Sequence, residues 1–167
     1  MKLTKLFLFL ASISALVISS DGAALAATTS APANLSVTAT VVKSCSISTS
    51  PVDFGNYSAL SGVANAQGSV TVTCSNGSGT SVALDYGKNV GAGNQPRMTD
   101  NGTNYLSYKL YSDSAFQTPW SGTSVPITPS TSPTPTAQVL AVYGQMPGAQ
   151  NVPPGSYSDI VVATVNF

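Results

Sequence analysis

The sequence predicts an all-β fold of the sandwich type, and three observations carry this prediction. Apolar residues recur at every second position, whereas the spacing of an amphipathic helix is missing. The alternating segments are short and rich in Val, Thr and Tyr, which strands favour. Clusters of Gly, Pro, Asn and Ser separate these segments. Short strands divided by such turns are typical of two packed sheets.

The first two predicted strands contain the two cysteines. Apolar residues alternate over 35–41, and this strand runs on to include Cys45. The second strand covers 70–74 and ends at Cys74, so the cysteines lie late on separate strands. In an oxidising compartment an even number of cysteines favours a disulfide. Two free thiols with redox chemistry are the alternative, but a C-x-x-C pair is missing.

Further strands follow along the chain. The longer ones cover residues 81–86, 105–111, 137–143 and 157–167, and the shorter ones cover 52–57 and 125–127. Turn-rich connections are expected at 75–79, 87–95 and 100–102. Residues 127–137 are rich in Thr, Pro and Ser and have too little apolar surface for a core. They are therefore predicted to form an exposed loop within the domain.

The N-terminal residues have the pattern of a secretory signal peptide. Two lysines precede an apolar run over 6–18, and a small-residue cleavage site ends at Ala26. Residues 1–26 are therefore predicted to be removed, so that the mature chain starts at Ala27. The apolar run is shorter than the roughly 20 residues that a membrane-spanning helix needs. We expect an exported protein with one domain and no membrane span.

The charged residues of the mature chain exclude several kinds of function. Four Lys or Arg side chains accompany five Asp, so no basic patch is expected for nucleic acid or an anionic membrane. The chain contains no His and no Glu. Nucleophilic triads and histidine zinc sites need His, and the aspartates resemble neither a catalytic pair nor a calcium loop. We therefore expect no enzyme, no catalytic or metal-binding residue and no cofactor.

The aromatic residues and the single arginine have structural interpretations. Trp120 and most of the tyrosines are expected to fill the core and corners of the sandwich, with a carbohydrate-binding platform as the alternative. Arg97 is expected to make a structural hydrogen bond or an ion pair with an aspartate. Contact of Arg97 with a ligand is the alternative.

Several stretches, spread over nearly the whole mature chain, form a recognisable set. They are 37–47, 54–57, 70–74, 96–98, 105–113, Trp120, 142–147, 154–159 and the terminal strand. Together they resemble the spore coat protein U domain family, which includes subunits of archaic chaperone/usher pili. The stretches that lead into the terminal strand are the most specific part of the resemblance.

The resemblance implies an incomplete immunoglobulin-like sandwich that lacks its final strand and is completed by donor-strand complementation. Such a fold leaves a groove with apolar side chains and unpaired backbone groups. In this family a periplasmic chaperone fills the groove first, and the N-terminal extension of the next subunit replaces it. The implied partners are the chaperone, an outer-membrane usher and neighbouring subunits, and the implied route leads through the periplasm to the cell surface.

The last strand is the contact that the resemblance implies for the chaperone and the donor strand. It ends on an aromatic residue, Phe167, whose terminal carboxylate is the implied chaperone anchor. The implied contact residues are Ile160, Val161, Val162, Ala163, Val165 and Phe167. Ile160 and Val162 lie on one face of the strand and the other four residues on the opposite face. The alternative is a last strand that only contributes to the core.

The predicted domain division leaves a short N-terminal extension. Residues 27–34 precede a sandwich domain over 35–167. The possible donor residues are Ala27, Thr29, Ala31, Ala33 and Leu35. Most of them are small, and Pro32 cannot donate a ladder hydrogen bond, so this donor is weak. A donor that extends into Leu35 and Val37 would shorten the first strand.

Three functions follow from these patterns. We expect a structural subunit of a bacterial surface fibre that is assembled by donor-strand exchange and serves adhesion or biofilm formation. A secreted spore or cell coat protein of the same fold that forms no pili is the alternative, and the weak donor favours it. A tip adhesin is disfavoured because such proteins usually add a separate recognition domain.

Overall fold

The structure, a computed structural model, describes residues 28–75, 80–127 and 134–167. The predicted signal peptide and parts of two predicted loops, 76–79 and 128–133, lie outside the described residues. The chain divides into two units, Met1–Ala39 and Thr40–Phe167. In the first unit, residues 28–39 form neither helix nor strand, and their side chains are exposed.

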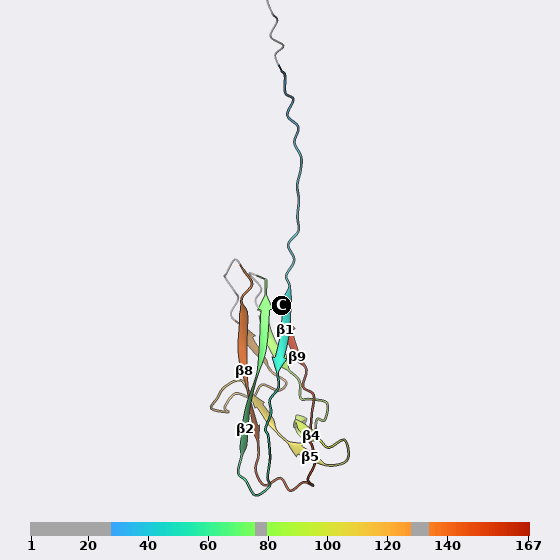
Figure 1. Cartoon of the computed structure of the whole chain (residues 1–167), viewed down its shortest axis with the longest axis vertical. Helices are drawn as coiled ribbons and strands as arrows, with labels where there is room; N and C mark the ends of the chain where they lie inside the picture. The colour runs from blue at the N-terminus through green and yellow to red at the C-terminus, as the bar shows by residue number, and fades with distance from the viewer. Residues whose placement is uncertain (1–27, 76–79, 128–133) are drawn as a thin grey trace, which may run out of the picture. The chain divides into compact units, whose positions relative to one another are not determined.

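The second unit consists of short strands (Figure 1). In chain order they are β1 (Cys45–Ser50), β2 (Ala64–Cys74), β3 (Thr80–Leu84), β4 (Arg97–Thr99), β5 (Tyr105–Ser107), β6 (Lys109–Tyr111), β7 (Ser124–Ile127), β8 (Ala137–Met146) and β9 (Ala163–Asn166), with a short 3-10 helix, η1 (Ala92–Asn94), before β4. The more buried residues occupy alternate positions along much of β2 and β8, because one face of each strand is turned to the core. The predicted all-β class is confirmed.

The strands form two main sheets and a separate hairpin. One sheet has the order β1-β2-β8-β6 and the other the order β7-β3-β9, and all neighbours are antiparallel. The hairpin pairs β4 with β5. The core contains Val70, Val72, Val142 and Met146 from the first sheet and Val82, Leu84 and Ile127 from the second. Side chains of both sheets therefore share one core, as in a β-sandwich.

One edge of the sandwich is closed by the connection between β6 and β7. Trp120 in this connection is fully buried. Its main-chain N–H donates to the carbonyl oxygen of Leu110 at 2.9 Å, and its indole N–H donates to the carbonyl oxygen of Val82 at 3.0 Å. Because Leu110 and Val82 belong to different sheets, Trp120 holds the two sheets together at this edge.

The opposite edge is formed by β1 and β9, which lie at the ends of their sheets. The two strands are neighbours, with Cα atoms that approach within 8 Å (Figure 1). Each has one hydrogen-bonded partner strand in the described part of the chain, β2 for β1 and β3 for β9. This edge of the sandwich is therefore the open one.

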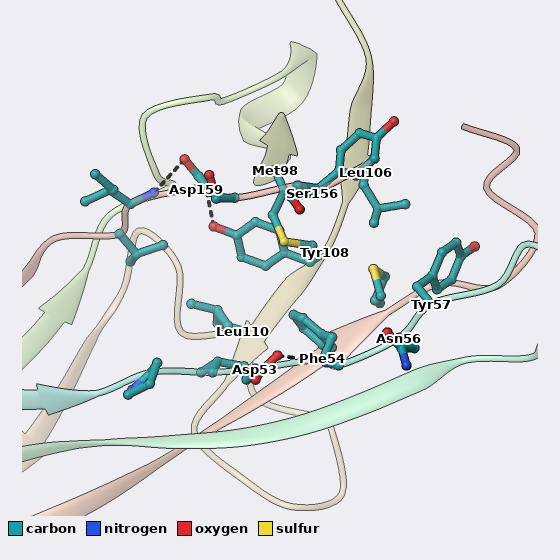
Figure 2. A pocket seen from close by; sticks show the side chains of 18 of the residues that line it. Asp53, Phe54, Asn56, Tyr57, Met98, Leu106, Tyr108, Leu110, Ser156 and Asp159 are labelled. Carbon is teal, nitrogen blue, oxygen red and sulfur yellow. Dashed lines mark hydrogen bonds between the residues drawn. The ribbon is translucent and has the colours of Figure 1, made fainter. Parts of the chain in front are cut away.

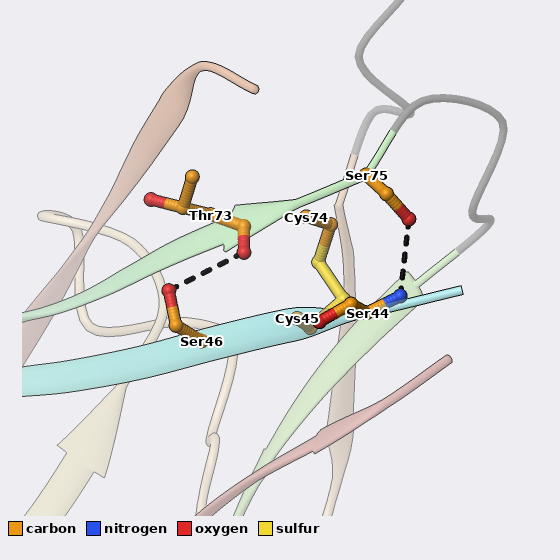
Figure 3. The surroundings of a disulfide bond; sticks show 6 residues. All are labelled: Ser44, Cys45, Ser46, Thr73, Cys74 and Ser75. Atoms are coloured by element: carbon orange, nitrogen blue, oxygen red, sulfur yellow. Dashed lines mark hydrogen bonds between the residues drawn. A yellow bond between two sulfur atoms is a disulfide. The ribbon is translucent and has the colours of Figure 1, made fainter. Parts of the chain in front are cut away.

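The predicted disulfide between Cys45 and Cys74 is confirmed. The two cysteines face each other at the first pair of the β1–β2 ladder. Ser44 and Ser75 extend the pairing beyond the bridge, since the Ser75 N–H donates to the Ser44 carbonyl oxygen at 2.8 Å. In addition, the Ser44 N–H donates to the Ser75 hydroxyl at 3.0 Å (Figure 3). The start of β1 is thus fixed to the end of β2.

The first predicted strand is wrong over its N-terminal part. Residues 35–44 form no strand, and β1 begins only at Cys45. The side chains of Leu35, Val37 and Val41 are 87%, 84% and 92% exposed. The reason is that β2, which pairs with β1 in the described part of the chain, ends at Cys74, so the ladder stops there.

Two other predicted strands differ from the structure. Residues 52–57 form no strand, because Pro51 lacks an N–H and a turn follows at Gly55, where φ is +61° and the N–H bonds the Asp53 carboxylate at 2.8 Å. The predicted strand over 105–111 is divided at Tyr108 into β5 and β6. The Tyr108 N–H bonds the carbonyl oxygen of Pro96 instead of a neighbouring strand.

The terminal strand is shorter than predicted and starts at Ala163 instead of residue 157.

The structural interpretation of the aromatic residues holds for Trp120, Tyr108 and Tyr111, which are buried. Arg97 donates to the carbonyl oxygens of Asn89 and Val90 and lies 4.0 Å from the ring centre of Tyr105. Its partners are therefore main-chain oxygens and a ring, as for a structural residue. No helix in the described ranges is long and apolar enough to cross a membrane.

Candidate functional site: a groove at the open edge

A groove of about 1080 Å³ opens where β1 ends and β9 begins. Figure 2 shows side chains that line it. One wall is the chain that continues from β1, residues 49–59. The other, the second wall, is the C-terminal segment 152–167, of which residues 152–161 and Ala163 of β9 line the groove. Its floor is apolar and consists of Val70, Leu84, Met98, Leu106, Leu110, Val142 and Met146. The groove therefore reaches the shared core from its open edge.

The first wall crosses close to the sheet because two glycines leave room for it. A Cβ atom on Gly68 of β2 would lie 2.8 Å from the carbonyl oxygens of Ser50 and Pro51. A Cβ atom on Gly144 of β8 would lie 2.5 Å from Cγ1 of Val52. Val52, Phe54 and Tyr57 consequently pack against the core from this wall. They cover part of the floor, where Val70 and Met146 are 1% exposed.

Among the described residues, main-chain hydrogen bonds hold the second wall on one side. The N–H and C=O of Ser158 bond Thr99, the C=O of Ile160 accepts from Lys88, and the C=O of Val162 accepts from Asp85. In an extended chain the main-chain groups of successive residues point to opposite sides. The N–H and C=O groups of Val161 and Ala163 therefore point to the other side, toward the groove that both residues line.

The carboxylate of Asp159 accepts several hydrogen bonds behind the second wall (Figure 2). Oδ1 of Asp159 accepts from the main-chain N–H groups of Lys88 (3.0 Å), Asn89 (3.2 Å) and Ile160 (2.9 Å), and from the side-chain amide of Asn89 (3.0 Å). Oδ2 of Asp159 accepts from the hydroxyl of Tyr108 at 2.7 Å. Burial raises the pKa of Tyr108, and the bond to Asp159 raises it further. Tyr108 is therefore a hydrogen-bond donor over the whole physiological pH range.

The residues predicted as the chaperone and donor contact are distributed over both faces of this wall. Val161, Ala163 and Val165 are half-buried and pack against the core. Ile160, Val162 and Phe167 are more than half exposed. The alternation predicted for the wall is thus present over 160–165, and Ile160, Val161 and Ala163 line the groove. Their contact with a chaperone remains a prediction.

The residues predicted as a possible donor segment are exposed. Thr29, Ala31, Ala33 and Leu35 lie in the segment without secondary structure, and Ala27 lies outside the described residues. Their role as donor also remains a prediction.

Several residues of the site have only a weak signal in the sequence. Phe54 and Tyr57 belong to a stretch that the sequence predicts as a strand, and Asp159 closes the stretch 154–159 of the family pattern. The partners of Asp159 are up to 71 residues away in the chain. A sequence pattern could mark Asp159, but it could not supply these distant partners.

The groove suits an extended chain better than a small polar molecule. Its floor is apolar and one wall offers main-chain donors and acceptors, which together match the side chains and backbone of a β-strand. A strand in this position would pair with the second wall and cover the half-buried side chains of both walls.

Comparisons with known proteins agree with this geometry. The family model described as the Spore Coat Protein U domain matches residues 31–164. The chain is 36% identical over 156 residues to Protein U of Myxococcus xanthus, with 82% of this chain and 85% of that protein covered.

A solved structure also resembles the chain. It is a chain of the CsuC–CsuE chaperone–tip adhesion subunit pre-assembly complex from the archaic chaperone-usher Csu pili of Acinetobacter baumannii, with a TM-score of 0.60 and 25% identity. The match covers 77% of this chain, which spans 40% of the length of the chain it matches. The fold is thus the immunoglobulin-like fold of pilus subunits, and the family and fold are those of structural pilus and coat proteins. With a family model matched over most of its length and a relative more than one-third identical, this chain belongs to the spore coat protein U domain family.

Proposed function

We propose that this protein is a structural subunit of a bacterial surface fibre, in which the groove of each copy receives a strand from the next copy. The observation that carries the proposal is the open edge between β1 and β9, with a groove behind it whose floor is apolar. An open sheet edge beside exposed apolar surface favours aggregation unless a strand covers it. Strand addition supplies the missing cover and joins two copies at the same time.

The N-terminal segment is the proposed donor. Residues 28–44 form no strand, and within them Leu35, Val37, Ala39 and Val41 occupy alternate positions with exposed side chains. A strand that places these four residues on one face would present an apolar row to a groove. The exposed segment is longer than the extension predicted from the sequence, and its apolar residues are larger than those of 27–34. The weak donor expected from 27–34 is therefore strengthened by the residues that follow.

The route to the surface is part of the proposal. Residues 1–26 direct export, and a periplasmic chaperone then pairs with the segment 160–167 until an outer-membrane usher passes the subunit to the fibre. The similarity to a chaperone–subunit complex supports the chaperone step. The fibre serves adhesion or biofilm formation.

A peptide of residues 28–44 tests the donor. The mature chain, refolded at low concentration, should bind a fluorescent form of this peptide, and an excess of peptide should prevent its polymerisation. A control peptide in which Leu35, Val37 and Val41 are replaced by Ser keeps the length and should not bind. A mature chain that stays monomeric at high concentration and ignores both peptides would refute the proposal.

A coat protein that packs without forming fibres is the second candidate, and the 36% identity to Protein U favours it. Removal of residues 28–44 separates the two functions. A fibre subunit without this segment should still bind the added peptide but lose polymerisation, which size-exclusion chromatography and electron microscopy would show. A coat protein of the second kind should assemble as before.

A further inference from the structure

In the described part of the chain, residues 152–162 of the second wall belong to no strand. Only residues 163–166 belong to β9, whereas residues 158–162 are held by the chain around Lys88 and by Thr99. The wall is nevertheless the edge to which an incoming strand must bind. The contacts that hold residues 158–162 in place therefore determine whether this edge is preformed before the strand binds.

Two aspartates make most of the hydrogen bonds that hold residues 158–162 in place. Asp85 bonds the wall twice, because its N–H donates to the Val162 carbonyl oxygen (3.1 Å) and its Oδ1 accepts from the Val162 N–H (2.9 Å). Asp159 belongs to the wall itself, and its Oδ1 accepts from the main-chain N–H groups of Lys88 and Asn89. Its Oδ2 accepts from the Tyr108 hydroxyl. Hydrogen bonds to an ionised carboxylate are stronger than those between neutral groups.

The surroundings of Asp159 are shaped to receive its carboxylate. Gly87 has φ of +82°, and a Cβ atom on it would collide with Oδ2 of Asp159 and lie 3.1 Å from the Tyr108 hydroxyl. The Asp85 carboxylate in turn accepts from the Gly87 N–H at 2.9 Å. The chain over 85–89 is thus folded around Asp159, and its shape depends on both aspartates.

We propose that Asp159 is a positioning residue for strand capture. By tying the wall to Lys88, Asn89 and Tyr108, it keeps the main-chain groups of Ser158, Ile160 and Val162 turned away from the groove. The groups of Val161 and Ala163 are then presented to the incoming strand. The wall is ordered before capture, so the incoming strand does not bear the entropy of ordering it. This inference rests on the proposed function, because it concerns the same groove.

The test compares Asp159→Ala with a matched control, Asp113→Ala. Asp113 also accepts several main-chain N–H bonds, from Ala115, Gln117 and Thr118, but in the connection at the closed edge of the sandwich. The measured quantity is the association rate of the labelled 28–44 peptide with the full mature chain, corrected for the folded fraction. Asp159→Ala should slow capture about tenfold or more, the equivalent of 1.4 kcal/mol, and Asp113→Ala should leave the rate within about twofold.

The conservative variant Asp159→Asn should restore most of the rate. Its carbonyl oxygen can still accept the N–H bonds, and its amide can donate to the Tyr108 oxygen. Equal capture rates for Asp159→Ala and the unchanged protein would overturn the inference. So would equal slowing by Asp159→Ala and Asp113→Ala, because a purely structural loss would affect both in the same way.

A proline pair tests the orientation of the wall. Ala163→Pro removes an N–H that points to the groove, so the chain should fold and fail to capture the peptide. Val162→Pro removes an N–H that bonds Asp85, so it should destabilise the unoccupied chain. The reverse pattern would place the wrong residues on the groove side and overturn the inference.

Hydrogen exchange keeps the two proposals distinguishable. If the unchanged protein captures no peptide, the proposed function fails. The role of Asp159 in holding the wall is then decided by the main-chain amides of Lys88, Asn89, Ile160 and Val162. Loss of their protection in Asp159→Ala supports this role, and retained protection overturns it.

Discussion

At Trp120, a single side chain joins the two sheets at the closed edge. Its ring is fully buried and its indole N–H reaches the carbonyl oxygen of Val82. Such a residue combines a large hydrophobic contribution with a hydrogen bond that orients it. The sequence predicts Trp120 in the core, and this prediction is confirmed. The sequence carries no sign of the residue with which the indole bonds, because Val82 is 38 positions away.

Replacement of Trp120 by Ala should therefore be severe. Loss of the buried ring and the cavity that remains should lower the free energy of unfolding by about 3–5 kcal/mol. Trp120→Phe should cost less, because it keeps an aromatic ring but leaves the Val82 carbonyl oxygen without its donor. Urea unfolding followed by far-UV circular dichroism measures both, since the variants lack tryptophan fluorescence. The control Tyr105→Phe, which keeps the ring beneath Arg97, should stay within about 0.5 kcal/mol of the unchanged protein.

At the scale of elements, two glycines decide where the first wall of the groove runs. A side chain on Gly68 would meet the main-chain oxygens of Ser50 and Pro51, whereas one on Gly144 would meet the ends of Val52 and Phe54 side chains. Side chains can rotate away, but a main-chain oxygen moves only with its segment. The two positions are thus a matched pair on neighbouring strands.

Gly68→Ala should destabilise the protein by about 1–3 kcal/mol, the usual cost of an overpacked core. It should also displace the wall over 50–54 and weaken binding of the 28–44 peptide. Gly144→Ala should have a smaller effect on both quantities. Chemical denaturation and fluorescence anisotropy of the labelled peptide measure them, and an equal effect of the two substitutions would show that the wall moves freely.

The strands show what a sequence can and cannot predict. Alternation marks β2, β3, β8 and the segment that contains β9, because each has one face on the core. The same alternation over 35–41 does not form a strand, since alternation records that a segment is suited to a sheet and not whether a partner is present. Tyr108 divides a predicted strand for a related reason, because the flanking strands β5 and β6 pair with different partners.

The groove was foreseeable only through the family resemblance. Composition and the alternation of apolar residues indicate a sandwich, but they do not reveal that one edge of it is open. The wall over 49–59 depends on close approaches at Gly68 and Gly144, and the opposite wall depends on Asp159 and partners from other elements. These are long-range packing relations, and a single sequence does not contain them.

The two edges of the sandwich differ in how their strands are held. Trp120 and its connection join the sheets at one edge, whereas at the other edge β1 is joined to its own sheet by the disulfide and a six-residue ladder. Most side chains of β1 are exposed, so the core contributes little to holding it. The disulfide therefore secures a strand that borders the groove and has few contacts with the core.

Removal of the disulfide by Cys45→Ala with Cys74→Ala should act on both stability and capture. The chain-entropy model for a bridge with a sequence separation of 29 gives a loss of about 3.6 kcal/mol in the free energy of unfolding. If the bridge acted only on the unfolded chain, affinity for the 28–44 peptide would not change. Because β1 has few core contacts, we expect it to fray without the bridge, which lowers the fraction of chains that can bind and hence the apparent affinity. Denaturation in the absence of peptide and titration of the folded variant with peptide separate the two effects, and an unchanged affinity would confine the role of the disulfide to the unfolded state.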